Sequence, residues 1–150
     1  MAGAAILINI QDEQALAALQ ALLARVTHLA PAFAKIGEYG LQSTRERIES
    51  QNTGNPVGIW APLSERYLKS PKKRAHHPGM ILELYGELVS TLAWQALGEE
   101  GVEWGSNRIY AAAQQFGRPE INLPDRPFLG ISELDQTEIG AILSTYIREG

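Results

Sequence analysis

A long connection between residues 51 and 80 is the feature that most limits how this chain can fold. It contains four prolines and three glycines, residues that interrupt helices and central strands. Regular structure is therefore expected in two blocks, one on each side of it. A connection of this length inside a compact domain is unusual and often functional. Trp60 is expected to attach its first half to the body, and residues 64–69 have the composition of a helical turn.

The block before the connection predicts a short strand and a first helix. Isoleucines at every second position over residues 6–10 are typical of a β-strand. Asp12 is a suitable cap for a helix that follows to about residue 29. Apolar residues in it recur at three- and four-residue spacing and form one stripe: Leu16, Leu19, Leu23, Val26 and Leu29.

A second helix is expected from Pro31 to just before residue 51. Proline is well placed in the first turn of a helix, and the Asn/Gly/Pro cluster at 51–56 is typical of a turn. The predicted buried face comprises Phe33, Ile36, Leu41 and Ile48. The predicted solvent face comprises Arg45, Glu46, Arg47 and Glu49.

The block after the connection favours a hairpin and two further helices. Residues 89–95 and 101–105 are the expected strands, with the turn at 97–100. A short helix is expected over 110–115, ended by Gly117, and prolines then favour an extended segment over 119–127. A last helix capped by Ser132 is expected to run to Ile147, with a buried face of Leu134, Ile139, Ile142, Leu143 and Tyr146.

These elements predict one α+β domain over residues 1–150. A small antiparallel β-sheet would pack against long N-terminal helices and a C-terminal helix, with a long Pro/Gly-rich basic loop between them.

The charge of the chain is unevenly distributed. The net charge is −4, whereas residues 65–77 carry a local charge of +4 from Arg66, Lys69, Lys72, Lys73 and Arg74 against Glu65. A basic loop on an acidic body favours self-association between unlike surfaces. A solvated loop and a loop that contacts phosphates of DNA without reading sequence are the alternatives.

Motifs that carry chemistry are missing from the sequence. There is no cysteine, no Gly-x-Ser-x-Gly elbow, no phosphate-binding loop and no dinucleotide fingerprint. The three histidines are His28, His76 and His77, and no carboxylate stands at a helical spacing from the adjacent pair to share a metal with it. We therefore expect no enzyme activity, cofactor, metal or small-molecule substrate. No apolar run reaches the ~18 residues of a spanning helix, so no membrane association or export is expected.

Several segments, in a fixed order, carry a resemblance to a known family. They are Ser43-Thr-Arg-Glu-Arg-Ile48 followed by Trp60-Ala-Pro-Leu-Ser64, then Ile81-Leu82 and Gly86-Glu-Leu88, then Gly105-Ser-Asn-Arg-Ile-Tyr110-Ala-Ala-Ala-Gln-Gln-Phe-Gly117, and finally Leu123-Pro-Asp-Arg-Pro-Phe-Leu-Gly130. Over residues 6–148 the chain resembles the virion morphogenesis or tail-completion proteins of Mu-like and P2-like phages. It departs from them at Gln114, where the family usually has His, and at Tyr85, where Asp or Ser is frequent.

The resemblance implies a structural virion protein, located in the neck or tail and assembled in the host cytoplasm. It would form a ring, sixfold in the family, around the DNA channel and join the tail to the capsid connector, with connector and tail proteins as neighbours. A tail terminator ring is the nearest alternative, followed by a small hydrolase or a DNA-binding accessory protein. Candidates for the subunit interface are Arg126, Phe128, Trp60, Tyr110 and Phe116, because aromatics and arginine on stiff backbone make strong contacts. Burial in the core is the alternative for Trp60, Phe116 and Phe128.

Overall fold

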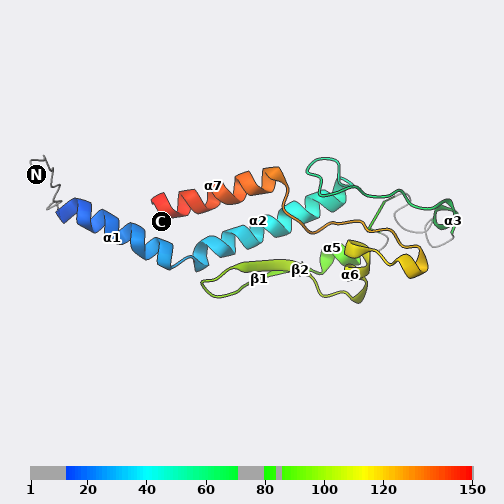
Figure 1. The fold of residues 1–150 in the computed structure, drawn as a ribbon, viewed down its shortest axis with the longest axis horizontal. Helices are drawn as coiled ribbons and strands as arrows, with labels where there is room; N and C mark the ends of the chain where they lie inside the picture. Colours follow the sequence, from blue (N-terminus) through cyan, green and yellow to red (C-terminus); the bar gives the residue numbers. More distant parts are fainter. Residues whose placement is uncertain (1–12, 71–79, 84–85, 150) are drawn as a thin grey trace, which may run out of the picture.

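The computed structural model describes residues 13–70, 80–83 and 86–149. Its helices are α1 (Glu13–Thr27), α2 (Ala30–Glu49), α3 (Glu65–Leu68), α5 (Glu87–Ser90), α6 (Ile109–Phe116) and α7 (Glu133–Glu149), with a 3₁₀ turn η1 (Pro119–Ile121). Two antiparallel strands, β1 (Leu92–Ala96) and β2 (Val102–Ser106), form the sheet (Figure 1). The predicted α+β class is confirmed. The predicted strand at 6–10 and the cap Asp12 lie outside the described residues.

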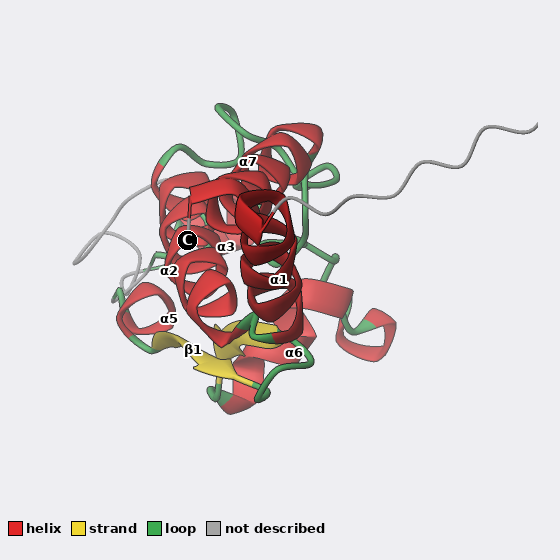
Figure 2. Cartoon of the chain, turned by 90° about the vertical axis from the view of Figure 1, so that its left-hand side faces the viewer, coloured by secondary structure: helices red, strands yellow, loops and turns green. Residues whose placement is uncertain are grey.

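Helix α2 is the centre of the fold. Its start at Ala30 places Pro31 in the first turn, as predicted, where the missing amide hydrogen costs no helical bond. The hairpin and α7 lie on opposite sides of it (Figures 1 and 2). The molecule is thus a layered structure in which one long helix contacts both the sheet and the C-terminal helix.

The hairpin packs on α2 through two tryptophans and two glycines. Trp94 and Trp104 are opposite each other in the register of the strands. A Cβ atom at Gly37 would meet the Trp94 ring at 2.6 Å, and one at Gly40 would meet the Trp104 ring at the same distance. Only glycine therefore lets the indole rings approach the helix backbone this closely.

The structure differs from the predicted hairpin at its beginning. Residues 89 and 90 belong to the helical turn α5 instead of the first strand. Gly86 precedes this turn in the left-handed conformation, with φ of 71°, and the Thr91 hydroxyl donates to the Glu87 carbonyl. This local turn, with Thr91 as its C-cap, replaces the first three residues of the expected strand. The predicted extended segment at 119–127 likewise begins with the 3₁₀ turn η1.

Helix α7 begins at the predicted cap. The Ser132 hydroxyl accepts from the amide of Asp135 at 3.0 Å, and the Asp135 carboxylate accepts from the amide of Ser132 at 3.0 Å. This reciprocal pair is a capping box with Asp in place of Glu. Of the predicted buried face only Tyr146 is fully buried, while Leu134 is exposed, because α7 contacts α2 and α1 along a narrow seam.

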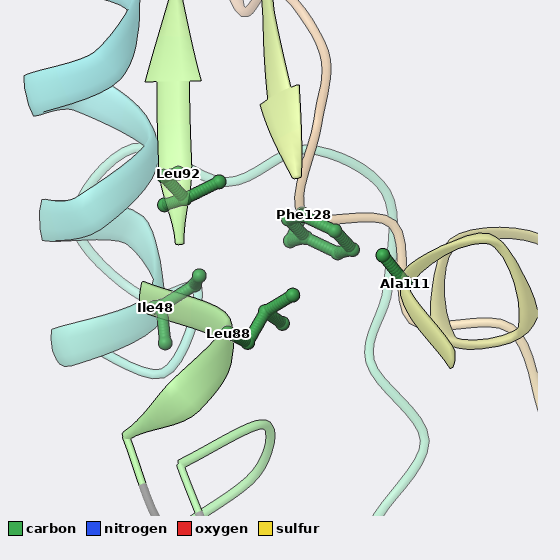
Figure 3. Close-up of a cluster of buried hydrophobic side chains, with 5 residues drawn as sticks. All are labelled: Ile48, Leu88, Leu92, Ala111 and Phe128. Carbon is green, nitrogen blue, oxygen red and sulfur yellow. The ribbon is translucent and has the colours of Figure 1, made fainter. Parts of the chain in front are cut away.

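The hydrophobic core lies where the hairpin, α2 and the segment before α7 meet. Its buried side chains are Ile48, Leu88, Leu92, Ala111 and Phe128 (Figure 3). Trp60 and Leu129 are among the half-buried residues packed around it. The core is small, and the described residues include more large hydrophobic side chains that are exposed than hydrophobic side chains that are buried.

Helix α1 extends from the body and packs against α7 (Figure 1). None of the residues of α1 is buried. Of the two N-terminal helices that were expected to pack on the sheet, α2 contacts both strands, whereas the main contact of α1 is with α7. Within the described ranges no single helix is long and apolar enough to cross a membrane. Helices α1 and α2, which meet at a bend of 51°, satisfy that test of length and composition only as a pair.

Candidate assembly interface

A buried ion pair joins α2 to α7. Arg47 Nη2 lies 2.7 Å from Asp135 Oδ2, and both side chains are almost completely excluded from solvent. Arg47 also donates to the carbonyl oxygens of Asn55, at 2.9 Å, and Phe128, at 3.0 Å. The predicted solvent position of Arg47 is therefore wrong. Its burial follows from helical periodicity, because Arg47 shares a face with Ile36, Gly40 and Ser43.

Asp135 is the acceptor at the centre of this cluster. Its carboxylate also accepts from Tyr39 at 2.8 Å, Ser43 at 2.7 Å and Asn55 at 2.9 Å. Burial opposes its ionisation, but hydrogen bonds from the Ser132 amide and these side chains outweigh burial and hold the pKa of Asp135 well below its usual value. Burial and the bond to Asp135 raise the pKa of Tyr39 to about 12. We call Arg47, Asp135 and their partners Tyr39, Ser43 and Asn55 the polar clamp.

The polar clamp has a structural function in this chain. It holds three segments on α2: the turn after the helix, the strand-like segment at 126–130 and the start of α7. Every buried side-chain nitrogen or oxygen in the described part of the chain has a hydrogen-bond partner. A fully satisfied buried network of this kind fixes geometry.

Arg126, the strongest predicted interface residue, is buried within the chain. Its guanidinium donates to the carbonyl oxygens of Ala61, at 2.8 Å, and Pro62, at 3.0 Å. Burial lowers the pKa of Arg126 from its ordinary value. The segment at 61–62 covers this side chain. A role at a subunit contact stays a prediction.

Trp60 and Phe128 complete the attachment of the long connection. Trp60 Nε1 donates to the Pro127 carbonyl at 2.6 Å, as the expected attachment of Trp60 requires. Phe128 is fully buried in the core, and its amide donates to Gln115 Oε1 at 3.0 Å. Both residues therefore make contacts within a single chain, and a role for them at a subunit interface stays a prediction.

Phe116 lies on the most exposed face of α6, whereas Tyr110 lies on another face of the helix, toward the groove described below. Phe116 is 78% exposed at the end of the helix, and Ile109 at its start is 98% exposed. Tyr110 is partly exposed, and burial raises the pKa of its hydroxyl. Burial of a side chain the size of phenylalanine lowers the free energy, so the face of α6 that carries Phe116 is suited to a protein contact.

A groove of about 710 Å³ opens beside α3, α5 and α6. Its walls are mainly apolar, and they include the side chains of Leu63, Tyr67, Ile81, Leu82, Tyr110 and Leu123. Polar residues are also part of the lining: Ser64, Glu87, Gln114, Asn122 and Arg126. Gln114 is also one of the positions at which the chain departs from the family it resembles.

The apolar stripe of α1 is a second exposed surface, and the prediction of an amphipathic helix did not reveal that it would be exposed. Leu19 is 53% exposed, Leu23 64% and Val26 48%, and Leu16 is exposed to a similar extent. These four residues, which we call the α1 stripe, stand at helical spacing. The opposite face carries Gln14 and Arg25 among alanines, so the sequence pattern shows which face is apolar but not that this face is exposed.

Contacts at its C-terminal end fix α1 in this position. Arg25 donates to the last carbonyl oxygens of α7, at Ile147 (3.0 Å) and Arg148 (2.9 Å), and the Tyr146 hydroxyl donates to the His28 carbonyl. Glu99, in the hairpin turn, accepts from the Ala30 amide at 2.8 Å and lies 2.7 Å from His28 Nδ1. The Ala30 bond lowers the pKa of Glu99. The α1 stripe is thus exposed on a helix whose base is held at several points.

The predicted basic loop is described in part. Arg66 and Lys69 are exposed at α3, and Lys69 lies 3.8 Å from Glu65 in a solvent-exposed pair of little energetic value. Lys72, Lys73 and Arg74 lie outside the described residues. In the described part of the chain no group of three His, Cys, Asp or Glu side chains could hold a metal ion.

Comparison with known proteins places the chain among phage proteins. A model of the phage virion morphogenesis family matches residues 10–148. The chain is 30% identical over 105 residues to the putative capsid assembly protein G of Escherichia phage Mu, a match that covers 66% of this chain and 67% of that protein. No solved structure matches significantly. Since the family model spans nearly the whole sequence, the chain belongs to the phage virion morphogenesis family.

Proposed function

We propose that this chain is a structural subunit of the phage head–tail junction. Copies of it would form a ring around the DNA channel and join the tail to the capsid connector. Membership of a virion morphogenesis family supports a role in building the particle, and the relative from phage Mu is named for capsid assembly. The proposal goes beyond this role in two respects: it places the chain at the head–tail junction, and it has the copies form a ring.

The observation that carries the proposal is the excess of exposed apolar surface. Large hydrophobic side chains are exposed on α1, on α6 and around η1, while the core of the chain is small. Stable monomers rarely expose contiguous apolar surface of this kind, whereas subunits of an assembly cover it with their neighbours. Figure 1 shows α1 at one end of the molecule and α6 toward the other, an arrangement that suits a subunit with more than one neighbour.

A structural role also agrees with the chemistry of the described residues. The buried ionisable groups of the polar clamp hold one another and do not line the groove. Exposed Arg66 and Lys69 on α3 could contact DNA phosphates inside a channel without reading sequence. We therefore propose an activity of binding and joining, with no reaction of its own.

The test is the mass of the purified protein by light scattering over a concentration series, with electron microscopy of the same samples. Rings would support the proposal and give the subunit number. Labelled antibody on purified virions would then separate the sites: label at the neck agrees with joining, whereas label only at the end of free tails indicates a terminator. A protein that is monomeric at every concentration and absent from virions would refute the proposal.

A further inference from the structure

The α1 stripe and the apolar groove lie at opposite ends of the molecule. Figure 1 shows α1 at one end and α3, which borders the groove, at the other. One surface is convex, a helix with leucines at helical spacing, and the other is a hollow of about 710 Å³ with apolar walls. We infer that α1 of one copy docks in the groove of the next copy. This inference rests on the proposed function, and it specifies the surfaces by which the subunits meet.

The shapes and chemistry of the two surfaces favour this pairing. An amphipathic helix commonly binds a partner by inserting anchors at i, i+3 and i+7 into an apolar groove. Leu16, Leu19 and Leu23 have this spacing, and the α1 stripe to Val26 is about 15 Å long. The groove lies in the range of ~300–1,000 Å³ that binding pockets span, so it can accept several side chains at once.

The free end of α1 is acidic, whereas the described ionisable side chains at and beside the groove carry a small net positive charge. The described part of α1 begins with the exposed acid Glu13. On the groove side, Arg66 of α3 and Lys69 directly after it are exposed next to the groove-lining Tyr67, and Arg126 lines the groove. The acids Glu65 and Glu87 offset two of these three positive charges. A positive rim and an acid at the start of the inserted helix guide docking and set its direction.

The placement of the surfaces at opposite ends determines the kind of assembly. Contacts between two different patches are heterologous, and they close into a ring when the rotation between copies permits it. A symmetric pairing of α1 with α1 would instead give a closed dimer and leave the groove empty. The docking of α1 in the groove therefore accounts for both surfaces with a single contact.

The experiment uses single cysteines, which the natural chain lacks entirely. Leu23→Cys places a thiol on the α1 stripe, and Tyr110→Cys places one at the groove. The two full-length variants, one with an affinity tag, are mixed and treated with a short bis-maleimide. Ala21→Cys, on the opposite face of α1, replaces Leu23→Cys in the matched control. Thiols held close together in a complex have effective concentrations in the mM range. The yield of cross-linked heterodimer is therefore expected to exceed the yield from the Ala21→Cys control by about tenfold or more.

A second measurement does not depend on cross-linking. Leu19→Gln and Leu23→Gln are each expected to weaken self-association by ~10- to 100-fold, because each leucine loses its burial in the groove. Ala21→Gln is the control, expected to leave self-association unchanged.

Several results would overturn the inference. Rings without the heterodimer cross-link would refute this contact and leave the proposed ring standing. Cross-links of Leu23→Cys to itself would show a symmetric α1 pair. Self-association that survives Leu19→Gln and Leu23→Gln would show that the contact lies elsewhere. A monomer with no cross-link at any concentration would overturn this contact, while the head–tail role would still be decided by the antibody labelling of virions.

Discussion

The polar clamp and the α1 stripe reverse the usual distribution of residues. In the clamp, an arginine and an aspartate are buried and fully hydrogen-bonded within one chain. In α1, five large aliphatic side chains are exposed to water, the four of the α1 stripe and Leu22. The clamp therefore has its partners inside the chain, whereas the described part of the chain leaves the α1 stripe about half exposed or more.

The difference separates residues that stabilise the fold from residues available for assembly. Removal of one partner from a buried ion pair leaves an uncompensated charge, so the clamp should be sensitive to substitution. Substitutions at exposed positions usually change stability little. Stability and self-association are thus expected to respond to different parts of the molecule.

The largest expected effect is on the clamp itself. Asp135→Asn leaves Arg47 buried without its counter-ion, and we expect the protein to lose about 3–5 kcal/mol of stability. The melting temperature would then fall by roughly 10 °C. Glu138→Gln, an exposed acid on the same helix, is the control and should melt like the natural protein. A fall of only one or two degrees for Asp135→Asn would show that the clamp is not a centre of stability.

Arg126→Ala is expected to be the next most harmful change. It removes the donors to the carbonyl oxygens of Ala61 and Pro62 and leaves space in a buried site, at a cost of about 1–3 kcal/mol. Chemical denaturation measures this loss, and Arg118→Ala, which removes an exposed arginine, is the control. If Arg126→Ala weakens assembly and leaves the unfolding midpoint unchanged, the residue acts at a subunit contact, as its sequence context predicts.

The clamp also predicts how stability depends on alkaline pH. The pKa of Tyr39 is about 12 in the folded chain, above the ordinary value of about 10. Tyr39 therefore ionises first in the unfolded state, and its contribution, complete below pH 10 or so, is lost as the pH rises towards 12. Between pH 9.5 and 11.5 the melting temperature of Tyr39→Phe should fall less steeply than that of the natural protein. The natural protein loses stability there because Tyr39 ionises in the unfolded state and stays protonated in the folded state, whereas phenylalanine cannot ionise. Parallel curves for the two proteins would contradict this assignment.

The smallest effect on stability is expected in the α1 stripe. Leu19→Gln should change the free energy of unfolding of the monomer by no more than about 0.5 kcal/mol, because the side chain is exposed. The comparison is sharpest at concentrations low enough to keep the natural protein monomeric. A loss of several kcal/mol would mean that the leucine packs inside its own chain.

The sequence predicted the regular elements better than their environment. Helix α2, helix α6, the hairpin and the Ser132 cap follow from periodicity and from local turn chemistry. Arg47 was misplaced because its neighbours are charged, and its partner Asp135 is 88 positions away along the chain. The α1 stripe was recognised as a pattern, but periodicity states which face is apolar and not what covers it.

The same distinction applies to the interface candidates. Trp60, Arg126 and Phe128 were chosen for size and stiff backbone, properties that serve a loop attachment as well as a subunit contact. Of the five candidates, Phe116 is the one whose side chain is mostly exposed. Local sequence cannot distinguish the two uses, because the carbonyl groups that Arg126 binds come from a segment more than sixty positions away.

The packing of Trp94 and Trp104 on α2 gives the protein an internal optical reporter. All three tryptophans, at positions 60, 94 and 104, lie in the body, and α1 contains none. Indole fluorescence will therefore follow the release of the hairpin and the long connection, while circular dichroism at 222 nm also records the residues of α1. A thermal transition seen by dichroism before any change in fluorescence would be the melting of helices that carry no tryptophan, α1 or α7, visible without any label.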